Sequence, residues 1–172
     1  MAMIHLVRHG QAAAGFGTHK DPGLDDSGRQ QAIAVAAMLE PLGPMPIWSS
    51  PLARAFETAE PLANLWQQQI KIETRVAEIL SPTKDLAARA QWLAQAMQGN
   101  WRDSLVACLL QIDHDCVMFS HYVAINAAVG TAQQDPRMRV FAPDNCSVTG
   151  LNNSGGVLTV ETLGRTADTR IN

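Results

Sequence analysis

Short apolar runs alternate with longer amphipathic stretches along the first three quarters of the chain. Short runs that are almost wholly apolar are typical of strands buried on both faces of a sheet. On this pattern we expect strands at residues 3–7, 47–49, 70–73 and 116–119. Residues 12–26 are instead rich in glycine and turn-forming residues, which predicts a loop.

The amphipathic stretches carry apolar residues at helical spacing. Asp26 or Ser27 is suited to cap the first helix, whose apolar face comprises Ala32, Val35, Ala36 and Leu39. Ser50 and Pro51 have the pattern of an N-cap followed by the first helical residue. A further helix is expected over residues 86–97, where Leu86, Ala90, Leu93 and Met97 form an apolar stripe. Two more helices are expected, one that starts at Asp103 or Ser104 and one over residues 123–129.

The last part of the chain changes to a strand-like pattern, with strands expected at residues 138–141, 147–151 and 157–163. Strands separated by helices favour an α/β fold. We expect a three-layer sandwich, with a mostly parallel central sheet, helices on both faces and antiparallel strands at the C-terminal end. A chain of 172 residues fits one domain, so residues 1–172 are expected to form a single catalytic domain.

Composition narrows the class of protein. Apolar residues make up 47% of the chain and charged residues 17%, a balance that excludes intrinsic disorder. A net charge of −3 with scattered basic residues argues against nucleic-acid or membrane partners, and no apolar run approaches the roughly 20 residues that span a bilayer. Three cysteines outside any CxxC spacing, with no secretory pattern at the N-terminus, favour a cytoplasmic protein with reduced thiols.

Two histidines and two arginines stand where predicted strands end. Arg8 and His9 follow the first strand. Arg54 lies in the first turn of the helix after the second strand, and His121 follows the strand at residues 116–119. In parallel sheets ligands bind at these ends, a guanidinium can hold two phosphate oxygens, and a neutral imidazole can attack phosphorus. The strand ends therefore predict a phosphate site.

No metal or other cofactor is expected. His5 and His9 are four residues apart, which on a strand separates them by about 13 Å, too far to chelate one ion. The segment at residues 113–115 combines two aspartates with a histidine but precedes a strand, which favours a polar turn.

Four segments, in order along the chain, resemble motifs of the histidine phosphatase superfamily, which includes the cofactor-dependent phosphoglycerate mutases. Residues 6–10 (LVRHG) resemble its RHG signature, and residues 24–32 (LDDSGRQQA) its first-helix segment. Residues 49–59 (SSPLARAFETA) are similar to its second arginine motif, and residues 119–121 (FSH) to its second-histidine motif. The resemblance implies a phosphoglycerate mutase-like fold.

The resemblance also implies a role for each matched residue. His9 would be the nucleophile that becomes phosphohistidine. The phosphoryl oxygens would be bound by Arg8, Arg54 and His121. Glu78 stands where the family keeps its proton donor, although the glycine-rich continuation common in mutases is missing after it.

Three further residues are candidates for substrate contacts. Gln11 replaces the acidic residue often found after the RHG signature, and Tyr122 replaces the glycine that many members have after the second histidine. Thr18 lies in the loop expected at residues 12–26. The departures at Gln11 and Tyr122 concern the choice of substrate rather than the core chemistry.

The resemblance thus implies a metal-independent phosphatase that hydrolyses phosphomonoesters through a phosphohistidine intermediate. Its substrate would be a phosphorylated small molecule or a phosphoprotein, and the oligomeric state is left open. The alternatives are a protein phosphohistidine phosphatase of the short branch, a phosphoglycerate-type mutase, and a non-catalytic module that binds a phosphorylated ligand.

Overall fold

A computed structural model describes residues 1–13, 21–79, 88 and 99–167 of the chain. Its six strands are β1 (Ala2–Arg8), β2 (Ile47–Ser49), β3 (Ile70–Ile72), β4 (Cys116–Ser120), β5 (Val148–Ser154) and β6 (Val157–Thr162). Its α-helices are α1 (Asp26–Leu39), α2 (Ala53–Trp66), α4 (Asn100–Leu110) and α5 (Tyr122–Gln133), with 3-10 turns η1 (Glu40–Leu42) and η2 (Thr74–Val76).

All six strands form one sheet in the order β3-β2-β4-β1-β5-β6. The first four in this order are parallel, whereas β5 is antiparallel to β1 and β6 is antiparallel to β5. Arg8 pairs with Ser120 at the ends of β1 and β4, so the residues that follow these two strands lie side by side. The mostly parallel sheet with antiparallel strands from the C-terminal part of the chain is confirmed.

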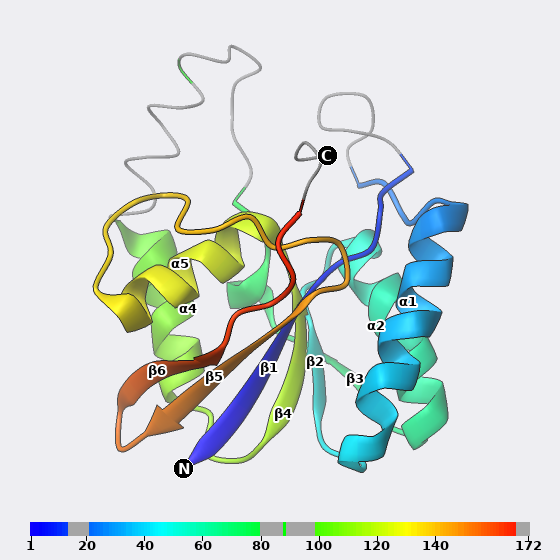
Figure 1. Cartoon of the computed structure of the whole chain (residues 1–172), viewed down its shortest axis with the longest axis horizontal. Helices are drawn as coiled ribbons and strands as arrows, with labels where there is room; N and C mark the ends of the chain where they lie inside the picture. The colour runs from blue at the N-terminus through cyan, green and yellow to red at the C-terminus, as the bar shows by residue number, and fades with distance from the viewer. Residues whose placement is uncertain (14–20, 80–87, 89–98, 168–172) are drawn as a thin grey trace.

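Helices cover both faces of the sheet, as expected for a three-layer sandwich (Figure 1). Because successive side chains of a strand point to opposite faces, Ile4 and Leu6 of β1 pack in the core beneath α4 and α5, whereas Val7 packs in the core beneath α1 and α2. The sheet thereby separates two apolar cores. None of the helices in the described part of the chain is long and apolar enough to cross a bilayer.

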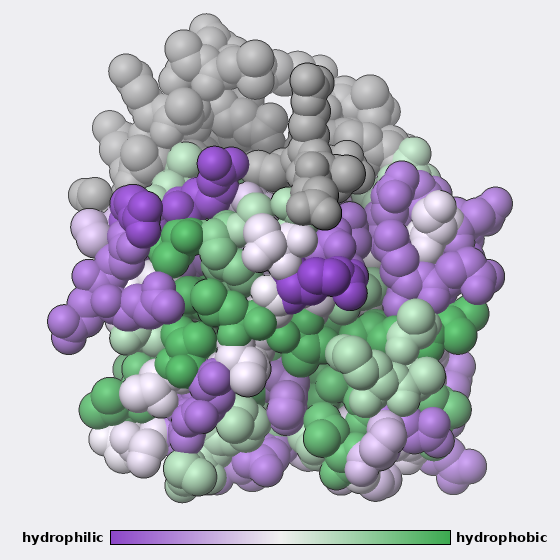
Figure 2. All heavy atoms as spheres, in the orientation of Figure 1, coloured by the Kyte–Doolittle hydropathy of each residue, from purple (hydrophilic) through white to green (hydrophobic). Residues whose placement is uncertain are grey.

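The surface of α1 changes along its length. Figure 2 shows hydrophilic residues near its N-terminal end and more apolar residues farther along. Ile33 and Met38 are among its exposed apolar side chains, with Met38 59% exposed.

The expectation of a strand at residues 138–141 is wrong, because this segment is irregular. The backbone N–H groups of Val140 and Phe141 both donate to Asn126 Oδ1, at 2.7 and 3.0 Å. A buried side chain of α5 therefore takes the hydrogen bonds that a neighbouring strand would take, and the alternating apolar pattern does not lead to strand pairing.

Helix starts differ from the sequence expectations by one to four residues. α1 is capped by Asp25, whose Oδ1 accepts the N–H of Gly28 at 2.7 Å. α2 begins at Ala53 with Leu52 as its N-cap, rather than with Ser50, and α4 begins at Asn100. The apolar stripe that predicted a helix over residues 86–97 lies outside the described residues.

Candidate active site

The carboxyl ends of β1 and β4 bring the two candidate histidines together, as the sequence predicted. The ring centroids of His9 and His121 are 5.2 Å apart, with the planes inclined at 57°. Both side chains are buried, and Arg54 Nε donates to His9 Nε2 at 3.3 Å from the first turn of α2. Three elements that are far apart in sequence therefore meet at one point.

His9 is held as a neutral imidazole with a defined proton position. Its Nδ1 lies 2.7 Å from the carbonyl oxygen of Gly10, which can only accept a hydrogen bond, so Nδ1 carries the proton and Nε2 has the free lone pair. Burial above all, aided by the nearby Arg54 and Arg8 and opposed by the Gly10 bond, lowers the pKa of His9 to about 3. A neutral Nε2 is the form that can attack phosphorus.

The backbone around His9 is fixed from several directions. The N–H of Gly10 donates to Thr58 Oγ1 (2.9 Å), whose hydroxyl donates to the Arg54 carbonyl (2.6 Å). Asn145 Nδ2 donates to the His9 carbonyl (3.1 Å). A Cβ at Gly10 would lie 2.7 Å from the carbonyl oxygen of Gly28, so the RHG segment needs glycine for a close backbone approach.

Arg8 is buried beneath the loop that precedes β5. Its Nη1 donates to the carbonyl of Pro143 (3.0 Å), and its guanidinium carbon lies 5.1 Å from the centre of the Tyr122 ring. The buried Nε of Arg8 has no hydrogen-bond partner among the described residues. Burial lowers the pKa of Arg8, but arginine stays protonated in proteins, so the group is a cation with a donor to spare.

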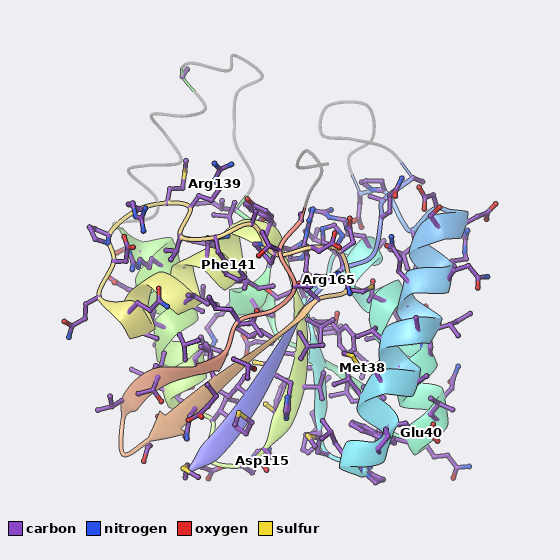
Figure 3. All side chains as sticks on the ribbon, viewed as in Figure 1. Met38, Glu40, Asp115, Arg139, Phe141 and Arg165 are labelled. Carbon is purple, nitrogen blue, oxygen red and sulfur yellow. The ribbon has the colours of Figure 1, made fainter. Side chains whose placement is uncertain are left out.

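The exposed Arg165 holds the loop before β5, which covers Arg8, through hydrogen bonds. Arg165 donates from Nε to Asp144 Oδ2 (2.9 Å) and from Nη2 to the carbonyl of Asn145 (3.2 Å). Figure 3 shows Arg165 near the carboxyl end of the sheet, whereas Asp115 lies at the opposite end. Arg165 thus links the segment after β6 to Asn145, which contacts the His9 backbone.

Glu78 lies at the N-terminus of α5. Its Oε2 accepts the N–H of Val123 (3.0 Å) and its Oε1 accepts the N–H of Ala124 (3.1 Å). Burial raises the pKa of Glu78, and this effect exceeds the lowering by these hydrogen bonds and by Arg54. A carboxyl group with a raised pKa is suited to donate a proton.

His121 is fully buried and has one bonded ring nitrogen. Its Nε2 lies 2.7 Å from Ser50 Oγ, while its Nδ1 is buried without a hydrogen-bond partner in the described ranges. Burial holds the pKa of His121 well below its usual value, and His9, Arg54 and Arg8 lower it further. The imidazole is therefore neutral at pH 7, and Nδ1 is the ring nitrogen left to bind another group.

The three residues suggested as substrate contacts, Gln11, Thr18 and Tyr122, do not share one environment. Tyr122 is buried and packs on Arg8. The backbone N–H of Gln11 donates to Gln31 Oε1 (2.8 Å), and its carbonyl accepts the N–H of Asp25 (3.0 Å). Thr18 lies outside the described residues.

The sequence pattern assigned no part in the site to Ser50, Thr58, Asn145 and Asp21. Ser50 and Thr58 lie inside the second arginine motif, so their position was a usable signal. Asn145 is separated from His9 by 136 residues and carried no signal. Asp21 Oδ1 accepts the N–H of Ala53 at 2.9 Å and lies close enough to Arg54 to raise its pKa, although burial lowers that pKa more.

Two cationic guanidinium groups, two neutral imidazoles and one carboxyl group thus lie near one another, with Glu78 close enough to Arg8 and Arg54 to raise their pKa values. This combination suits a tetrahedral anion that gains and loses a proton during a reaction. The part of the chain that the structure describes contains no group of three or more His, Cys, Asp or Glu residues able to hold a metal ion.

Residues 4–106 match the model of the histidine phosphatase superfamily (branch 1). A glucosyl-3-phosphoglycerate phosphatase of Mycolicibacterium vanbaalenii is 39% identical over 77 residues, which are 42% of this chain and 34% of the relative. The corresponding protein of Mycobacterium tuberculosis is 35% identical over 77 residues, with the same two shares. The match therefore spans about a third of the length of these curated relatives.

Solved structures share the fold over almost the whole chain. A mycobacterial glucosyl-3-phosphoglycerate phosphatase superposes with a TM-score of 0.79 at 20% identity, covering 96% of this chain and 99% of that one. A phosphoserine phosphatase mutant from Entamoeba histolytica, solved with phosphoserine, gives a TM-score of 0.78 at 20% identity and covers 94% and 96%. At this identity the likeness establishes the α/β fold.

Proposed function

The chain belongs to the histidine phosphatase superfamily (branch 1), and from this premise we propose that it hydrolyses phosphomonoesters through a phosphohistidine intermediate, without a metal ion. The observation that carries the proposal is the neutral His9, whose Nδ1 is tied to the Gly10 carbonyl and whose Nε2 lies beside Arg54. This geometry supports a nucleophile next to a permanent cation.

In the first half-reaction, Nε2 of His9 attacks phosphorus and the bond from phosphorus to the ester oxygen breaks. Glu78 gives its proton to the leaving oxygen, so an alcohol departs and Glu78 becomes a carboxylate. Arg8 and Arg54 bind the phosphoryl oxygens together with His121. Because these donors are fixed before the reaction in a buried site, they stabilise the transition state without reorganising.

In the second half-reaction, the carboxylate of Glu78 takes a proton from a water molecule as its oxygen attacks phosphorus. The bond from phosphorus to His9 Nε2 breaks, and inorganic phosphate leaves. Glu78 is then protonated again and His9 is neutral, so both groups have returned to their starting states.

For the substrate, we propose a phosphorylated small molecule. The relatives are named for glucosyl-3-phosphoglycerate and phosphoserine, and one solved neighbour is a complex with 3-phosphoglyceric acid. These three compounds are the first members of a substrate panel, and a phosphohistidine-bearing protein is its last. Turnover of the protein substrate alone would favour a protein phosphohistidine phosphatase, and isomerisation of phosphoglycerate without release of phosphate would favour a mutase.

The covalent intermediate provides the test. Brief reaction with a 32P-labelled phosphomonoester and an alkaline quench should leave an acid-labile label on the protein. His9→Ala should abolish both label and turnover, whereas His114→Ala, which changes an exposed histidine outside the site, should retain both. A labelled His9→Ala protein would contradict the proposal. Binding of phosphate esters by the wild type without any label or turnover would indicate a binding module.

The proposal includes a cytoplasmic location. The three cysteines are buried and unpaired in the structure, which supports a reducing compartment. Trapping of free thiols directly on lysis, followed by counting of the modified cysteines, tests this part.

A further inference from the structure

The hydroxyl of Ser50 links the N-terminus of α2 to His121. The N–H of Leu52 donates to Ser50 Oγ at 3.2 Å, and Ser50 Oγ lies 2.7 Å from His121 Nε2. Ser50 and His121 are both fully buried. Water therefore does not compete for these hydrogen bonds, and each polar atom has to be satisfied by its neighbours.

The position of the hydroxyl proton follows from counting donors and acceptors. A serine hydroxyl has one proton to donate and two lone pairs to accept with. Ser50 Oγ already accepts the N–H of Leu52, and within the described residues His121 Nε2 is the acceptor that the hydroxyl proton can reach. With the proton on Nε2 instead, the oxygen would receive two donors and its own buried proton would stay unsatisfied, which is costly.

The hydrogen bond from Ser50 also determines which ring nitrogen of His121 carries the proton. Burial and the neighbouring His9, Arg54 and Arg8 keep His121 neutral, and a neutral imidazole carries a single N–H. If Nε2 accepts from Ser50, this N–H is at Nδ1, the nitrogen that has no partner among residues within the described ranges. An N–H donor beside His9 attracts a phosphoryl oxygen, whereas a lone pair at the same place would repel it.

We propose that Ser50 is a positioning residue: its hydroxyl donates to His121 Nε2 and so holds the imidazole in the Nδ1–H tautomer that donates to a phosphoryl oxygen. The inference rests on the proposed phosphatase function for its purpose, because it specifies the state in which His121 meets phosphate. It also explains why a serine stands two residues before the N-cap of α2, where its oxygen accepts the Leu52 N–H and its proton faces the imidazole.

The first test measures the wild type and needs no substrate. In protein labelled with 15N-histidine, two-bond proton–nitrogen correlations report which ring nitrogen carries the proton, and the His121 ring is assigned by its loss in His121→Gln. We expect the Nδ1–H tautomer in the wild type at pH 7. A proton on Nε2 would overturn the proposal, whether or not the protein proves to be a phosphatase.

The second test compares two neighbouring serines. Ser49 is also fully buried, but its hydroxyl donates to the Ser50 carbonyl at 2.9 Å and not to the imidazole. Ser50→Ala should therefore populate the Nε2–H tautomer of His121, whereas Ser49→Ala and Ser50→Thr, which keeps a hydroxyl, should retain the wild-type pattern. An unchanged tautomer in folded Ser50→Ala would also overturn the proposal.

Inorganic phosphate serves as the probe for the consequence. Loss of one hydrogen bond to a charged ligand should weaken phosphate binding by Ser50→Ala by about 10- to 100-fold relative to Ser49→Ala, measured by calorimetry. Equal affinities of the two variants would show that the tautomer does not matter for the ligand and would contradict the proposed role. If the wild type binds no phosphate at all, the proposed function fails, while the NMR result still decides the tautomer.

Discussion

The N-termini of α1 and α5 are capped in different ways. α1 uses its own N-cap residue, because Asp25 Oδ1 accepts the N–H of Gly28 three residues later. The N-cap residue of α5 is His121, which makes no capping bond, and the first amides of this helix instead donate to Glu78, 45 residues earlier in sequence. A cap within the helix can be replaced without touching the site, whereas the cap of α5 is the proposed proton donor.

The difference shows that one group, Glu78, can both stabilise a helix N-terminus and take part in the proposed reaction. Free N–H groups at a helix N-terminus favour a negative charge, so α5 stabilises the carboxylate form of Glu78, while burial favours the protonated form. A group held between these two effects can change protonation during a reaction. Asp25 experiences no comparable burial and serves the helix alone.

The largest expected effect is that of Glu78→Gln on the rate. An alkoxide leaving group is strongly basic and needs a proton as its bond breaks, so phosphorylation by an alkyl phosphate should slow by about two to four orders of magnitude. Nitrophenolate leaves without help, so a nitrophenyl ester should be affected much less. Single-turnover phosphorylation rates across esters of graded leaving-group basicity measure this dependence.

Glu73→Gln is the matched control. Glu73 forms its ion pair with Arg75 (2.9 Å) and not with an arginine of the proposed site. The Glu73→Gln substitution should leave the dependence on the leaving group unchanged. Equal slowing of both esters by Glu78→Gln would mean that Glu78 supports the N-terminus of α5 and that another residue donates the proton.

The next effect concerns acid stability. The pKa of His9 is about 3 in the folded protein and about 6.5 in the unfolded chain, so the unfolded state binds more protons between these values. The contribution of His9 to stability is therefore present above pH 6.5 and is lost as the pH falls toward 3. Lowering the pH from 6.5 to 5 should cost about 2 kcal/mol through this group.

Urea unfolding at several pH values measures the slope. His9→Gln should remove this contribution, while His114→Gln should keep it because His114 is exposed. Glu78 acts in the opposite sense: its raised pKa gives stability below its unfolded pKa that is lost as the pH rises. Identical slopes for the two histidine variants would argue against a buried, neutral His9.

A smaller effect is expected at the cap of α1. Asp25→Ala should lower the free energy of unfolding by about 1 kcal/mol through loss of the capping bond, with unchanged phosphorylation rates. Asp26→Ala, which removes a carboxylate from an exposed pair with Arg29, should change stability by less. A change of more than tenfold in rate for Asp25→Ala would show that this cap also supports the site.

The smallest effect is that of Tyr122→Phe. The ring packs on Arg8, and the buried hydroxyl has no hydrogen-bond partner in the described part of the chain. Removal of this hydroxyl should change the free energy of unfolding by less than about 0.5 kcal/mol and leave phosphate affinity unchanged. A clear loss of affinity for phosphate esters, measured by calorimetry, would instead support the substrate contact that the sequence suggested for Tyr122.

The sequence by itself determined the order of the elements and the placement of the histidines and arginines. Apolar runs mark strands because both faces of a central sheet are buried, and parallel strands bring their carboxyl ends to one edge. The pattern of residues is therefore enough to assign Arg8 and His121 to the same rim. The motif around Arg54 added the third element, since its helix follows a strand of the same sheet.

Only the tertiary structure decided how those groups are held and charged. Residues 138–141 have a strand-like pattern, but Asn126 reaches their backbone from α5, and such a contact between distant segments leaves no periodic trace in the sequence. Asn145 supports His9 in the same long-range way. The direction of the pKa shift of Glu78 depends on burial, which is a property of the surrounding chain and not of residue types along it.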